Sequence, residues 1–202
     1  MRVLINVTSQ ILPSYQVGPL IQTKWGQGEP FNTCVPFGEL YNGVYSRCVT
    51  GCVAVATAQL MYYGHYKSNK PSWMYSQGSC VGYSWDGYKN YLFSFSESST
   101  TVWNVMRPNF GFYGATGAQE VAILMGYVGF KTEMEYGRTA SSASSDNVPG
   151  VLSIFGITCN QQDFNLSKVI SNLNINKPVY SSAYRTRESV RFLGIHLYYK
   201  YK

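Results

Sequence analysis

The chain has 202 residues, enough for one domain with a substantial hydrophobic core. Apolar residues make up 45% of it and charged residues only 13%. A surface covered by Tyr, Ser, Asn and Gly instead of Lys and Glu favours secretion or a cell-surface location. The net charge of +6 comes from scattered basic residues, and no apolar stretch is long enough to span a bilayer, so neither nucleic-acid binding nor a membrane span is expected.

Residues 1–19 are predicted to be a lead-in, and residues 20–202 one domain. The lead-in has a short strand-like piece and ends at Gly18-Pro19, a dipeptide that marks a turn or loop. Its apolar run Val3-Leu4-Ile5 is too short for a signal-peptide core, so any export signal is expected outside this chain. Turn-rich, irregular sequence follows as far as Thr50.

A central helix is predicted to begin at Cys52. Small or apolar residues recur at the spacing of one helix face as far as Gly64, and more of them fill the opposite face. The helix is therefore expected to be packed on most of its circumference.

In the later part of the chain, the predicted helices come before the predicted strands. A helix is predicted over 118–128 and closed by Gly129, followed by an exposed loop over 139–150. A third helix spans 166–173, and strands are predicted at 179–183 and 195–200, where the period changes to two. This order predicts an α+β fold whose strand region has only begun.

Five cysteines leave one thiol over after any complete pairing, and the pairing among Cys34, Cys48, Cys80 and Cys159 stays open. Paired Cys-x-x-Cys knuckles are absent from the sequence, and its two histidines are far apart. A zinc site is therefore not expected, and neither is another metal or an organic cofactor.

The position of Cys52 favours a nucleophilic role. At the first turn of a helix, a thiol faces unpaired backbone N–H groups and the positive end of the helix dipole, and both favour the thiolate. Gly51 leaves room for a substrate backbone. Two other interpretations stay open, namely a small buried side chain and a disulfide or redox pair with Cys48.

Four segments together resemble the streptopain family of papain-like cysteine peptidases. They are "TKWGQGEPFN" at 23–32, "TGCVAVATAQLMYYGHY" at 50–66, "GYVGFKTEMEYG" with the following "SSAS" at 126–144, and "NKPVY" at 176–180. Their order and spacing agree with the family over residues 17 to about 200. The resemblance implies a papain-like fold, here mostly the helical lobe with the first strands of the β lobe.

The resemblance also implies a secreted cysteine endopeptidase. Cys52 matches the family's nucleophile, and Gln27 matches the glutamine whose amide completes an oxyanion hole with the Cys52 N–H. Polypeptides are the implied substrates, with a propeptide or a protein inhibitor as further partners, and Trp25 is expected to be a packing residue.

The family's catalytic histidine has no clear match. His65 lies 13 residues beyond Cys52, about 20 Å away on one continuous helix. His196 is the remaining histidine, but Ile195 separates it from Gly194 where the family has a Gly-His pair. The chain is therefore expected to be a fragment cut at both ends, with residues 1–19 as the remnant of a propeptide junction, and to be inactive alone. The alternative is a non-catalytic remnant or binding module that uses the aromatic segment 73–95.

Overall fold

The computed structural model describes residues 18–38, 42–68, 79–80, 83–84, 93–94, 103, 105–110, 117–182, 184–185 and 190–191. Its helices are α1 (Cys52–Ser68), α3 (Ala118–Lys131), α4 (Val148–Ile154) and α5 (Leu166–Asn174), with a 3₁₀ turn, η1, at Ser145–Asn147. Short strands form three pairs in this part of the chain: β1 (Ser79–Cys80) antiparallel to β3 (Phe93–Ser94), β2 (Tyr83–Ser84) parallel to β4 (Glu135–Tyr136), and β5 (Tyr184–Arg185) antiparallel to β6 (Val190–Arg191).

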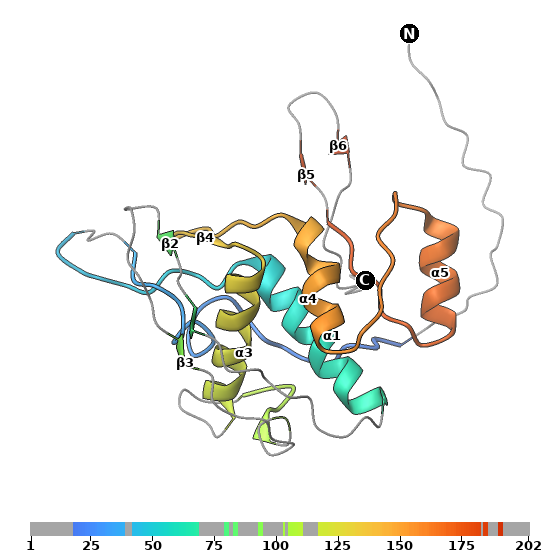
Figure 1. The fold of residues 1–202 in the computed structure, drawn as a ribbon, viewed down its shortest axis with the longest axis horizontal. Coiled ribbons are helices and arrows are strands. Elements are labelled where there is room, and N and C mark those ends of the chain that lie inside the picture. Colours follow the sequence, from blue (N-terminus) through green and yellow to red (C-terminus); the bar gives the residue numbers. More distant parts are fainter. Residues whose placement is uncertain are drawn as a thin grey trace, which may run out of the picture.

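Helix α1 is the centre of the core. Every residue from Val53 to Tyr62 is buried, which confirms the prediction of a helix packed on most of its circumference. Helices α3 and α4 both contact α1, and Figure 1 shows the three beside one another with α5 at the edge of the molecule. This packing fixes the start of α1, where Cys52 lies.

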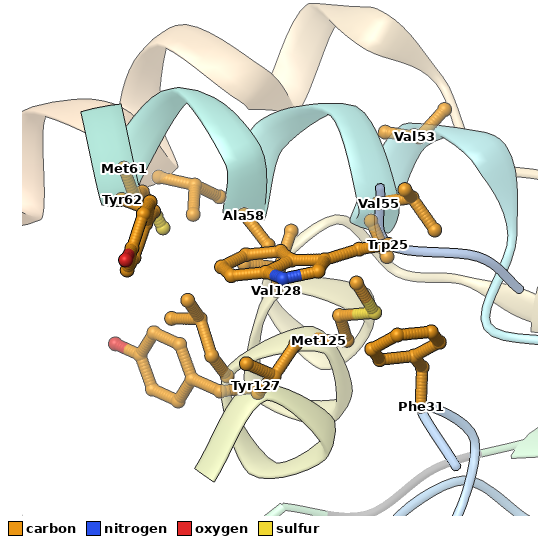
Figure 2. Close-up of a cluster of buried hydrophobic side chains, with 14 of the residues drawn as sticks. Trp25, Phe31, Val53, Val55, Ala58, Met61, Tyr62, Met125, Tyr127 and Val128 are labelled. Carbon is orange, nitrogen blue, oxygen red and sulfur yellow. The ribbon is translucent and has the colours of Figure 1, made fainter. Parts of the chain in front are cut away.

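Trp25 joins the irregular N-terminal region to this core. Its ring lies between α1 and α3 (Figure 2) and meets the Tyr62 ring edge-on at 5.0 Å between centroids. The Trp25 Nε1–H donates a hydrogen bond of 2.7 Å to the Arg107 carbonyl. The prediction that Trp25 is a packing residue is confirmed, and the segment it anchors also carries Gln27.

Helix α3 runs past the glycine that was predicted to close it. Gly129 lies inside the helix, where an added Cβ would collide with the Tyr136 hydroxyl, so close approach explains this glycine. The helix ends in a Schellman motif: Met134 N–H bonds to Gly129 O at 2.8 Å, and Glu133 N–H to Phe130 O at 3.0 Å. Glu133 takes the left-handed position, with φ of 55°.

The predicted loop over 139–150 is partly wrong. Its last residues form η1 and the start of α4, with Pro149 in the first turn of that helix. Proline and glycine usually mark turns, but the first helical turn tolerates proline because its N–H groups have no intrahelical partner. Val151 and Leu152 then bury α4 against the core.

Helix α5 confirms the third predicted helix, but of its predicted apolar face only Val169 is buried. The strand predicted at 179–183 is wrong for 179–182, which form no ladder, because an extended segment becomes a strand only beside a partner. Pairing begins at β5 instead. The strand predicted at 195–200 lies outside the described residues, as does most of the aromatic segment 73–95.

Candidate active site

Cys52 is the first residue of α1, and its side chain is exposed. The Gly51 carbonyl accepts the first bond of the helix, from Val55 N–H at 3.1 Å. The N–H groups of the first turn therefore have no partner inside the helix, and the turn holds no acidic side chain to compete for them. An exposed thiol beside free N–H donors and the positive helix end can act as a nucleophile.

Gly51 makes the sharp entry to the helix. Its φ is 84°, in the left-handed region that favours glycine. A Cβ on Gly51 would lie only 2.6 Å from Met134 Sδ, and Met134 is itself buried. Glycine is thus required here by backbone conformation and by the approach of Met134.

A turn at residues 137–141 holds the segment that leads to Cys52. Val49 N–H bonds to the Gly137 carbonyl at 3.1 Å, and the Ser141 hydroxyl donates to the Val49 carbonyl at 2.7 Å. The same Ser141 oxygen accepts from Gly137 N–H at 3.0 Å. Sequence reasoning did not assign a role to Ser141, although it lies in the "SSAS" block that carries the family resemblance.

Gln27 lies beside the same segment. Its carbonyl accepts the backbone N–H of Thr50 at 3.0 Å and the Thr50 hydroxyl at 3.3 Å. Thr50 is two residues before Cys52, and the side chains of Gln27 and Cys52 are both exposed. The structure therefore brings together the neighbourhoods of the two residues predicted from sequence.

Tyr180 is a neighbour of Cys52 that sequence reasoning missed. Burial, and then the negative charge of Cys52, raises the pKa of the Tyr180 phenol far above its usual range. Its ring packs against the core cluster, and its hydroxyl oxygen is buried. The one sequence feature that could have indicated Tyr180 was its position at the end of "NKPVY", a segment that resembles the corresponding segment of the family.

The other described thiols differ from Cys52. Cys34 and Cys48 are buried, Cys159 lies at the surface, and no disulfide joins Cys48 to Cys52. Burial raises the pKa of the Cys34 thiol, and partial desolvation by neighbouring atoms raises the pKa of Cys159. Among the residues that the structure describes, no cluster of His, Cys, Asp and Glu could hold a metal ion.

The two histidines do not meet Cys52 in the described structure. Helix α1 is continuous through His65, which places that residue about 20 Å along the axis from Cys52. His196 lies outside the described residues. None of the helices in the described part of the chain has the length and apolarity to cross a membrane.

Comparisons with known proteins identify the family to which this chain is related. The sequence profile of the peptidase C10 family matches residues 25–192. Two streptopains from Streptococcus pyogenes, one of them from serotype M28, are 31% and 30% identical over 173 residues, which cover 77% of this chain and 43% of each relative. The chain thus spans less than half the length of these curated relatives.

Solved structures agree with the sequence comparison. Active interpain A cysteine protease from Prevotella intermedia is 28% identical with a TM-score of 0.56, covering 78% of this chain and 63% of that one. A fragment of prointerpain A from the same organism is 31% identical with a TM-score of 0.51, covering 67% of this chain and 41% of that one. The α+β fold is that of papain-like cysteine peptidases, present mostly as the helical lobe, and the chain belongs to the peptidase C10 family.

Proposed function

We propose that the chain carries the nucleophile half of a secreted cysteine endopeptidase site, with Cys52 as nucleophile and Gln27 in the oxyanion hole. The observation that carries this proposal is an exposed thiol at the start of the buried helix α1, beside the segment that holds Gln27. Membership of the peptidase C10 family supports the same assignment. Polypeptides are the substrates, and a propeptide or a protein inhibitor is the further partner that the family suggests.

In the reaction, the Cys52 thiolate attacks the peptide carbonyl carbon, a C–S bond forms, and the carbonyl electron pair moves to oxygen. The Gln27 amide and the Cys52 N–H donate hydrogen bonds to that oxyanion. Expulsion of the amine requires a proton and leaves a thioester, which water hydrolyses to release the acid and restore the thiol.

Protonation of the leaving amine is the step of the reaction that this chain does not carry out by itself. His65 is too far along α1, and His196 departs from the Gly-His pattern of the family. The 202-residue chain alone is therefore expected to leave casein intact. Proteolysis that is abolished by Cys52→Ser and by His196→Ala would contradict this and make His196 the base.

A peptide aldehyde tests the proposed site without that proton step, because the thiol adds to the aldehyde carbon and no amine departs. Calorimetric titration of the full chain is expected to show binding that Cys52→Ser abolishes. Gln27→Ala should weaken it by about tenfold to a hundredfold, because a hydrogen bond to a charged oxygen contributes about 1.5–3 kcal/mol.

Gln119→Ala is the matched control. Gln119 is an exposed glutamine on α3 whose side-chain amide donates a hydrogen bond to Cys34 Sγ, so its loss should leave the affinity unchanged. Equal affinities for the wild type and Gln27→Ala would remove Gln27 from the oxyanion hole. Binding that survives Cys52→Ser would remove Cys52 as the nucleophile.

A further inference from the structure

The Asn32 side chain is a buried amide that is only partly hydrogen-bonded. The residue is 6% exposed, and its Nδ2–H donates a bond of 3.0 Å to the Cys48 carbonyl. Its Oδ1 atom is buried and has no hydrogen-bond partner in the part of the chain that the structure describes. Leaving a buried polar atom unpaired costs at least as much free energy as one neutral hydrogen bond contributes. The amide therefore adds little net stability, and its main effect is to fix where the Cys48 carbonyl lies.

The bond from Asn32 is one of two connections between the segment of Gln27 and the segment that leads to Cys52. At the other connection, the Gln27 carbonyl accepts the backbone N–H of Thr50 at 3.0 Å and the Thr50 hydroxyl at 3.3 Å. Residues 27–32 and residues 48–50 therefore lie side by side, and they are held at both ends. The second of these segments enters α1 directly, at Gly51 and Cys52.

The segment 27–32 is itself held in place. Phe31 N–H bonds to the Gly28 carbonyl at 2.9 Å, which closes a tight turn. The Phe31 ring is buried and meets the Phe110 ring edge-on at 5.9 Å between centroids. On the other side of Gln27, the buried Trp25 ring anchors the chain to the core. The backbone of Gln27 is thus fixed, and the reach of its exposed side chain depends on how this segment lies against the start of α1.

The proposed oxyanion hole takes one donor from each of these two segments. Its donors, the Gln27 amide and the Cys52 N–H, must both come within about 3 Å of the same oxygen atom. A displacement of about 1 Å between such groups is enough to lose most of their joint effect. The connection at Thr50 alone would let one segment rotate against the other, whereas a second connection at Asn32 fixes their orientation.

We propose that Asn32 is a positioning residue for the oxyanion hole. Its bond to the Cys48 carbonyl holds the segment of Gln27 against the segment of Cys52, so that the Gln27 amide and the Cys52 N–H point to one oxygen atom. Asn32 acts through these two residues and takes no part in bond formation or proton transfer. The inference rests on the proposed roles of Cys52 and Gln27.

The test is a double-mutant cycle on binding of the peptide aldehyde by the full chain, measured by calorimetry. Asn32→Leu keeps the approximate size of the side chain and removes the donor, and it is expected to weaken binding about tenfold. In the Gln27→Ala chain the same substitution should change the affinity by about twofold or less, because the amide that Asn32 positions is absent. The rate of Cys52 alkylation by iodoacetamide, followed by peptide mass spectrometry, should stay unchanged, because alkylation forms no oxyanion.

Gln59→Leu is the matched control. Gln59 is another buried amide with a single bond, from Nε2–H to the Thr23 carbonyl at 3.2 Å, and its Oε1 also has no partner among the described residues. It lies about two turns along α1 from Cys52, and Trp25 anchors the chain between Thr23 and Gln27. Its loss should therefore leave the aldehyde affinity unchanged. Equal weakening by Gln59→Leu and Asn32→Leu would overturn the inference, because both would then act through the general stability of the core.

The other outcomes separate this inference from the function on which it rests. If Asn32→Leu bound the aldehyde as tightly as the wild type, the inference would be overturned and the roles of Cys52 and Gln27 would stand. A loss of equal size in the Gln27→Ala chain, or slower alkylation of Cys52, would also overturn it. Gln27→Ala that binds as tightly as the wild type would overturn the oxyanion hole and the inference together.

A second variant covers the case in which leucine at position 32 prevents folding, as urea unfolding would show. Asn32→Ala removes the donor without adding bulk. It should reproduce both the tenfold loss and its dependence on Gln27. An Asn32→Ala chain that binds as tightly as the wild type, or whose loss is the same with and without Gln27, would again overturn the inference.

Discussion

Gly51 shows how one residue determines the position of the nucleophile. Its φ of 84° turns the chain sharply into α1, and Met134 occupies the space where a side chain would begin. A larger residue would have to distort the turn or displace a buried methionine. Because Cys52 is the next residue, either change would alter the direction of the thiol.

Gly51→Ala is therefore expected to reduce the free energy of unfolding by about 2–5 kcal/mol, from left-handed strain and overpacking together. Gly43→Ala is the matched control: its φ is 77°, but nothing lies within 4 Å of the added Cβ. Strain alone predicts a loss of about 1–2 kcal/mol there. Urea unfolding measures both, and equal losses would show that Met134 does not restrict residue 51.

Tyr180 predicts a pH dependence of stability. The fold raises the pKa of its phenol above the value near 10 of an unfolded chain. Above pH 10 the unfolded state loses this proton while the folded state keeps it, so stability falls as pH rises. Urea unfolding at pH 8–11 should give a steeper decline for the wild type than for Tyr180→Phe. Parallel declines would show that Tyr180 does not contribute.

At the scale of elements, the turn at 137–141 supports the start of α1. Ser141→Ala removes a donor to the Val49 carbonyl and an acceptor for Gly137 N–H in a partly buried site. A loss of about 1–3 kcal/mol in the free energy of unfolding is expected. Ser153→Ala, which removes an exposed bond within α4, should cost well under 1 kcal/mol by the same urea measurement. If Ser141→Ala reduced the free energy of unfolding no more than this control, the claim that the turn supports the start of α1 would be contradicted.

Helices with a long apolar period could be predicted from sequence, and shorter elements could not. Helices α1, α3 and α5 lie where their apolar spacing predicted helices, although α3 extends beyond Gly129 and only Val169 of the predicted α5 face is buried. Helix α4 has seven residues and begins with Val148-Pro149-Gly150, which is typical of a loop until the core selects a helix. The strand predicted at 179–183 failed because pairing is decided by a distant partner.

The residues of the candidate site also divide into those that could be predicted from the sequence and those that could not. Cys52 and Gln27 could be named because their local sequences resemble a family, and the structure brings their segments together through Thr50. Ser141 and Tyr180 are separated from Cys52 by 89 and 128 residues, so no local pattern connects them to it. The bond of Ser141 to the Val49 carbonyl and the electrostatic effect of Cys52 on Tyr180 arise only when α1 packs within the folded domain.

At the scale of the whole molecule, the site depends on the core around α1. Met61 is fully buried in that core (Figure 2), between elements that come from both halves of the chain. Met61→Ala is expected to reduce the free energy of unfolding by about 2–5 kcal/mol because it leaves a cavity. Ile175→Ala, at a position 60% exposed, should change it by about 0.5 kcal/mol or less in the same urea titration. A small Met61→Ala effect would contradict the central place of α1.

The most direct measurement is a crystal structure of the full chain with a peptide aldehyde. The account predicts a covalent bond from Cys52 Sγ to the aldehyde carbon, with the oxygen about 3 Å from both the Gln27 amide nitrogen and the Cys52 backbone nitrogen. An adduct on another thiol, or an oxygen turned away from Gln27, would contradict it.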